Sequence, residues 1–78
     1  MSESLEKIFG VILKGLRTGK GLSQESLAYD SELDRTFISL LERGERQPSI
    51  STLFKLAKSL NIKPSVIIKT LEELYENS

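Results

Sequence analysis

Apolar residues spaced three or four positions apart, in five separate runs, constrain the fold of this chain more than any other feature. This spacing places the apolar side chains on one face of an α-helix. The runs lie at about 5–16, 23–29, 34–43, 50–60 and 63–75. No stretch alternates between apolar and polar residues as a half-buried β-strand would. The pattern therefore predicts a compact all-α fold of five helices.

Turn-forming residues separate the runs. Gly19, Gly21 and Gly44 follow runs and can adopt the positive φ that ends a helix, while Ser23 and Asp34 precede runs and can cap a helix N-terminus. Pro64 suits the first turn of the last helix. These signals leave two short helices, 23–29 and 34–43, joined by about four residues, which is the spacing of a helix-turn-helix.

The size and composition of the chain favour one folded unit. It has 78 residues, of which 38% are hydrophobic, so we treat 1–78 as a single domain. No stretch approaches the roughly 18 apolar residues of a membrane span, and the start MSESLEKIFG lacks a basic leader followed by an apolar run. We expect a cytoplasmic protein that does not contact membranes.

The side-chain chemistry argues against catalysis. The chain has no Cys and no His, which removes the usual nucleophile, near-neutral base and zinc ligands, and it has no Gly-rich phosphate loop. We expect no enzyme activity, no metal, no cofactor and no small-molecule ligand. The 11 basic and 11 acidic residues cancel, which is unusual for a nucleic-acid binder and predicts modest non-specific affinity.

Four apolar positions meet the packing needs of a helix-turn-helix. Ala28 is small enough for close helix packing, Leu33 can anchor the turn, and Ile38 and Leu41 can fix the second helix to the core. Any small helical bundle could show similar spacings, so the pattern alone leaves an ordinary bundle open.

Two segments then carry a family resemblance. GLSQESLA at 21–28 and LDRTFISLLERGERQPSISTLFKLAKSL at 33–60 resemble the phage-repressor-like (XRE/Cro-type) helix-turn-helix family, and LDRTFIS looks most like the controller proteins of restriction-modification systems. The resemblance implies a lambda-repressor-like fold and a transcriptional regulator that binds specific double-stranded DNA. Glu32 departs from the family, which commonly has Gly or Asn there in a left-handed turn.

The groove-facing residues of the second helix are the candidate readers. Arg35 can donate two hydrogen bonds to guanine, although a solvated charge paired with Glu32 or Asp34 is the alternative. Phe37 is either a core residue, which we favour, or a ring that touches the DNA backbone. The predicted base-reading residues are Arg35, Thr36, Ser39, Leu40 and Arg46.

Phosphate contacts are expected on both sides of this helix. The N–H groups at a helix N-terminus favour anions, and repressor-like relatives place a Gln there. For the serine and threonine after Pro48, helix capping is an equally good account. The predicted phosphate-binding residues are Ser23, Gln24, Arg43, Gln47, Ser49 and Thr52.

The resemblance also implies a structural ion pair between Arg17 and Glu42, which would tie the first helix to the end of the third. Loss of one partner from such a pair is costly if solvent is excluded. Acidic residues on or after the third helix could also contact RNA polymerase. Glu42 and Glu45 are candidates for this role and equally for ion pairs.

The last helix, 63–75, has more apolar surface than one stripe needs. We expect Ile67, Leu71 and Leu74 to pack against a second copy in a homodimer, with a broader intramolecular contact as the alternative. A protein-interaction module, such as an antitoxin or anti-repressor, is the rival function.

Overall fold

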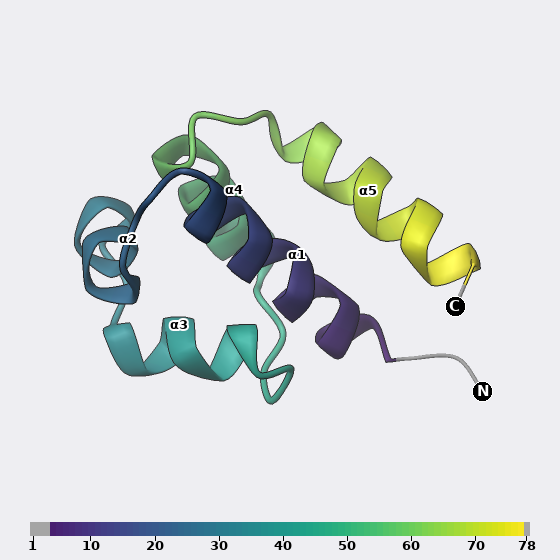
Figure 1. The fold of residues 1–78 in the computed structure, drawn as a ribbon, viewed down its shortest axis with the longest axis horizontal. Helices are drawn as coiled ribbons and strands as arrows, with labels where there is room; N and C mark the ends of the chain where they lie inside the picture. Colours follow the sequence, from purple (N-terminus) through teal and green to yellow (C-terminus); the bar gives the residue numbers. More distant parts are fainter. Residues whose placement is uncertain (1–3, 78) are drawn as a thin grey trace.

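The computed structural model describes residues 4–77, and within that range the chain forms five helices and no strand (Figure 1). This confirms the all-α prediction. No helix in the described part of the chain is long and apolar enough to cross a membrane. The helices are α1 (Leu5–Gly19), α2 (Gln24–Ser31), α3 (Arg35–Glu42), α4 (Ile50–Ser59) and α5 (Pro64–Glu76).

Helix α1 lies at the centre of the arrangement. It packs against α3 on one side and against α5 on the other, and α5 runs antiparallel to it, so that α1 begins and α5 ends at the same end of the molecule (Figure 1). Helices α2 and α4 complete the core. The largest fully buried side chains come from four helices and the residue after α4: Leu13, Leu27, Ile38, Leu41, Leu56 and Leu60. The third helix is thus held by the centre of the core.

Serine hydroxyls cap two of the helices as the sequence predicts, but the predicted cap of α3 is wrong in its chemistry. Ser23 Oγ accepts from the N–H of Ser26 at 3.0 Å, and Ser49 Oγ accepts from the N–H of Thr52 at 3.1 Å. Asp34 occupies the cap position of α3 with extended backbone angles, yet its side chain makes no capping hydrogen bond. Its carboxylate therefore stays exposed beside the start of α3.

The turn between α2 and α3 keeps the left-handed geometry that Glu32 put in question. Glu32 has φ 59° and ψ 37°, and the N–H of Leu33 donates to the carbonyl of Ala28 at 2.9 Å. The same conformation recurs after α4 at Asn61, with φ 55°. Asn tolerates this region because its short polar side chain can bond locally, whereas Glu pays the steric cost.

The structure of α5 shows that part of the predicted dimer surface, Ile67, Leu71 and Leu74, is wrong. Ile67 is 2% exposed and belongs to the core of its own chain, so it is not available to a second copy. Leu71 is half-buried and packs against the core, and Leu74 is exposed. The apolar excess of the helix is thus used first to cover α1 and α4.

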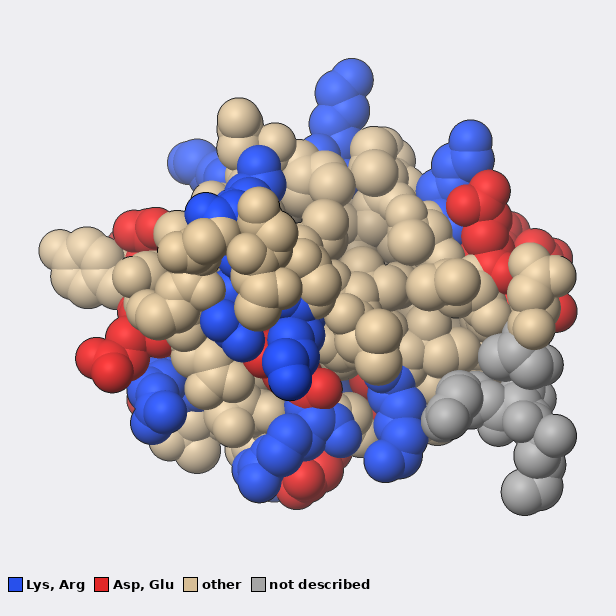
Figure 2. Space-filling model, in the orientation of Figure 1, with Lys and Arg blue, Asp and Glu red and all other residues tan. Residues whose placement is uncertain are grey.

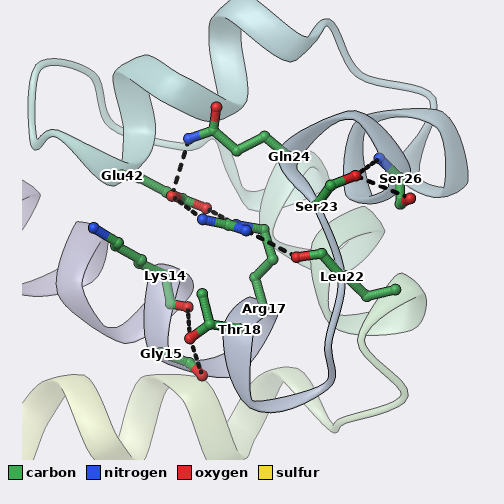
Figure 3. Close-up of polar contacts among 9 residues, drawn as sticks. All are labelled: Lys14, Gly15, Arg17, Thr18, Leu22, Ser23, Gln24, Ser26 and Glu42. Atoms are coloured by element: carbon green, nitrogen blue, oxygen red, sulfur yellow. Dashed lines mark hydrogen bonds and ion pairs between the residues drawn. The ribbon is translucent and has the colours of Figure 1, made fainter.

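Arg17 and Glu42 form the ion pair that the resemblance implied (Figure 3). Arg17 Nε lies 2.6 Å from Glu42 Oε2 and Nη2 lies 3.0 Å from Oε1, while Nη1 donates to the carbonyl of Leu22 at 2.8 Å. The two side chains are 11% and 4% exposed. Burial of Glu42 acts to raise the pKa of its carboxyl, but the hydrogen bonds from Arg17 and Gln24 outweigh it and hold that pKa below its ordinary value. The pair therefore joins α1, α3 and the segment before α2.

Replacing Glu32 by Asn should stabilise the protein, because Asn fits the left-handed turn without the steric cost of a longer side chain. We expect the free energy of unfolding to rise by about 1 kcal/mol, measured by urea denaturation. The matched control is Asn61→Glu, the reverse change at the equivalent exposed turn, which should lower it by a similar amount. If wild type and Glu32→Asn have equal free energies of unfolding, the backbone at Glu32 is not strained.

Replacing Glu42 by Gln should lower the free energy of unfolding at pH 7 by about 3 kcal/mol, because it leaves the Arg17 guanidinium buried without a counter-charge. The pKa of Glu42 is lowered by folding, so the ionised carboxylate stabilises the fold above about pH 4.3 and this stabilisation is lost as the pH falls. Thermal melts of wild type and variant should therefore converge only once the pH falls below the lowered pKa that Glu42 has in the folded protein. Glu45→Gln, at an exposed ion pair, is the control; a Glu42 variant that melts normally would contradict the assignment.

Candidate nucleic-acid interface

The first turn of α3 presents its polar side chains to solvent. Arg35 and Thr36 are exposed, and Ser39 and Leu40 are half-buried one turn later. Within residues 4–77 the ion pairs are Arg17–Glu42 and Arg43–Glu45, so Arg35 pairs with neither Glu32 nor Asp34. Its guanidinium keeps all its donors available for an acceptor outside the chain.

Phe37 lies between the two alternatives that the sequence left open. Its side chain is half-buried and packs against the core. Its neighbour in the next position, Ile38, is fully buried. The ring therefore contributes to the core while one part of it stays on the surface.

The N-terminus of α2 lies against the last turn of α3. Gln24 Nε2 donates to Glu42 Oε1 at 3.1 Å, which fixes the side-chain amide next to the Arg17–Glu42 pair (Figure 3). Because Leu27 N to Ser23 O is the first hydrogen bond of the helix, the N–H groups of Gln24 and Glu25 point out of its end. Free N–H groups and an oriented amide form a suitable cradle for a phosphate.

The loop after α3 carries the remaining predicted cations. Arg43 and Glu45 form an exposed ion pair, with 3.4 Å between Nε and Oε2, and Arg46 Nη1 donates to the carbonyl of Glu45 at 3.0 Å. A hydrogen bond from the Gln47 side chain lowers the pKa of Glu6, at the start of α1. These contacts are exposed and weak, so a phosphate can replace them at little cost.

The predicted residues at the start of α4 act as a cap in this structure. Ser49 Oγ lies 3.1 Å from Ser51 Oγ and 3.0 Å from Thr52 Oγ1, in addition to its bond with the Thr52 N–H. Capping thus accounts for Ser49 and Thr52 without a ligand. Their expected phosphate contacts stay a prediction.

The basic and acidic residues are unevenly spread over the surface. Because they are equal in number, a basic face requires that acidic residues gather elsewhere. Figure 2 shows Lys and Arg side chains along the lower edge, where Figure 1 has α3 and the loop that follows it, with some acidic side chains among them. Acidic side chains gather instead over the end of α5, whose exposed residues include Glu72, Glu73 and Glu76. The more basic part of this face therefore coincides with the predicted reading helix.

The sequence did not predict two of the contacts at this surface. The Gln24–Glu42 bond joins residues 18 positions apart, and the Glu6–Gln47 bond joins two segments that meet only in the folded chain. Neither has a local signal, because periodicity and capping rules describe neighbours along one helix. Family resemblance supplied the Arg17–Glu42 pair but not its third partner.

Comparison with known proteins identifies the family of this chain. A sequence model of the helix-turn-helix family matches residues 13–67. Control protein C.BamHI of Bacillus amyloliquefaciens is 35% identical over 69 residues, which cover 87% of this chain and 85% of that protein. The solved structure of the restriction-modification controller protein C.AhdI from Aeromonas hydrophila is 48% identical, with a TM-score of 0.76 over 78% of this chain and 92% of that one.

A further solved structure shows a relative with DNA. It is the restriction-modification controller protein C.Esp1396I as a tetramer in complex with its natural 35 base-pair operator, at 37% identity and a TM-score of 0.83 over 95% of this chain and 99% of that one. These relatives favour a regulator over the protein-interaction module that the sequence left open. The chain belongs to the helix-turn-helix family of DNA-binding transcriptional regulators and, within it, to the controller proteins of restriction-modification systems.

Proposed function

We propose that this controller protein binds a roughly palindromic operator as a homodimer, with α3 of each copy in the major groove. Arg35 is the principal base reader, donating to guanine O6 and N7, while Thr36 and Ser39 contact neighbouring base edges and Leu40 contacts a thymine methyl. The observation that supports this most is the exposed Arg35 side chain at the start of α3, which has no partner within residues 4–77.

The phosphate contacts are proposed for the two sides of α3. The side chain of Gln24 and the free N–H groups at the start of α2 would bind phosphates of one DNA strand, and Arg43 and Gln47 would bind phosphates of the other. Arg46 extends from the same loop and adds a base contact. Ser49 and Thr52 keep their caps and add hydroxyl contacts at most, because their oxygens already bond each other.

The surface proposed for the second copy is an apolar groove between α4, α5 and the start of α1. Leu5, Phe9, Ile50, Ile68 and Leu71 line it, and Leu5, Ile50 and Ile68 are 42%, 73% and 45% exposed. Leu71 is thus the one member of the predicted stripe on this groove, since Leu74 lines a different groove beside Val11. The C.Esp1396I relative assembles with itself on its operator, which supports a second copy as the occupant.

Dimerisation would set two α3 helices about 34 Å apart, one turn of DNA, and would make occupancy depend steeply on protein concentration. The proposed site of action is the cytoplasm, where the operator lies. Contact with RNA polymerase is part of the proposal only through Glu45, because Glu42 is buried against Arg17 and Glu45 is exposed in a weak pair.

Replacing Arg35 by Ala should cost roughly 1 to 3 kcal/mol of operator binding and should relax the preference at one guanine. DNA selected from a random pool by wild type and variant, followed by titration of single base-pair substitutions, measures both. The matched control is Arg43→Ala, which should weaken all sequences alike and reduce the salt slope by about one. If Arg35→Ala also weakens all sequences alike, Arg35 contacts only phosphate.

Replacing Ile68 by Glu should shift the protein from dimer to monomer, because it places a charge in the apolar groove. Operator affinity should fall with it, and sedimentation at micromolar concentration measures the change. Val11→Glu is the matched control: Val11 is 69% exposed and lies outside this groove, so the dimer should persist. A wild-type monomer with undiminished operator binding would contradict the dimer.

A further inference from the structure

Helix α1 lies very close to the end of α3 at Gly10. A Cβ at this position would lie 2.5 Å from the carbonyl oxygen of Glu42, 2.6 Å from that of Leu41 and 2.9 Å from the carbonyl carbon of Glu42. All three are backbone atoms, so no change of rotamer could relieve the contact. Only a residue without a side chain allows α3 to lie this close to α1.

A second glycine, Gly44, also lies close to α1, against Lys7. Gly44, just after α3, has φ 74°, and a Cβ there would lie 2.7 Å from Lys7 Cγ and 2.8 Å from Lys7 Cα. Gly44 also closes α3, since its N–H donates to the carbonyl of Leu41 at 3.1 Å. A glycine in α1 and a glycine just after α3 thus allow the last turn of α3 to pack closely against the first half of α1.

The segment that this contact holds is the one that carries the proposed DNA residues of the loop. Arg43, Arg46 and Gln47 follow Glu42 directly, and the N–H of Glu45 donates to the carbonyl of Leu40 at 2.9 Å, which makes the loop continuous with the helix end. The start of α3, with Arg35, lies at the opposite end of the helix. A change at Gly10 would therefore move the loop more than it moves Arg35.

We propose that Gly10 is a positioning residue for sequence recognition: its missing side chain sets how far the end of α3 and residues 43–47 stand from α1, and so where Arg46 meets the DNA. An ordinary contact between non-bonded atoms is about 3.5 Å, so an added methyl pushes this end outward by about 1 Å. Hydrogen bonds to base edges do not survive such a shift with good geometry, whereas phosphate contacts by flexible side chains do. The proposal rests on the proposed base contact of Arg46.

Gly10→Ala tests this, with Gly15→Ala as the matched control. Gly15 lies on the same helix, and a Cβ there meets nothing within 4 Å. The measurement is the affinity for the selected operator, for single base-pair substitutions of it and for unrelated duplex DNA, with thermal melts to establish folding. We expect Gly10→Ala to lose about tenfold in the ratio of operator to unrelated affinity, at the base pair that Arg46→Ala relaxes. Gly15→Ala should retain the ratio.

A folded Gly10→Ala protein with the wild-type ratio would overturn the proposal, and so would an equal loss of affinity for operator and unrelated DNA. If Gly10→Ala does not fold, Gly44→Asn approaches the same contact while tolerating the positive φ. It should show the same loss, and failure of both variants to fold would assign the contact to folding alone. Should Arg46→Ala relax no base pair, the base contact on which the proposal rests is absent and the role proposed for Gly10 fails, whereas relaxation by Arg35→Ala still tests the proposed function separately.

Discussion

The attachment of the last turn of α3 to α1 is the constraint on which the proposed DNA-binding surface depends. It combines a buried ion pair, Arg17 with Glu42, and a contact at Gly10 too close for any side chain. The ion pair holds two flexible side chains together but does not set the spacing of the two helices. Close packing sets that spacing but does not neutralise a buried charge. Together they hold the short helix α3, which has only eight residues and would be marginal by itself.

The same carboxylate links folding to the proposed phosphate site. Glu42 accepts from Arg17 and from Gln24, so the amide at the start of α2 is held by the group that holds α3. Both charges of the pair are buried and cancel, so neither adds to the field that attracts DNA. The attraction is left to exposed cations, among them Arg35, Arg43 and Arg46, which face weak competition from acidic neighbours.

The sequence predicted the elements of the fold well and the contacts between them less well. The helices and the buried Ile38 and Leu41 follow from local spacing, whereas the left-handed turn at Glu32 was implied by the family resemblance and not by the Glu itself. The apolar stripe of α5 did not say which side faces the core, and Ile67 turned out to be inside, because periodicity gives a face but not its partner. Asp34 occupied its predicted position without the predicted bond. The close contact at Gly10 could not be predicted from the sequence. A glycine within a helical run indicates only a weak helix former, and the backbone that it contacts lies far away in the sequence.

A neutral chain must obtain specificity in a particular way. With 11 charges of each sign, it gains little from the general attraction between basic proteins and phosphate, which normally supplies most of non-specific affinity. Discrimination then depends on a few side chains held at the right distance from base edges, and the proposed dimer would present each of them twice through its two-fold symmetry. In such a protein the rigidity of α3 against α1 contributes directly to recognition, because a small displacement removes a base contact that electrostatic attraction cannot replace.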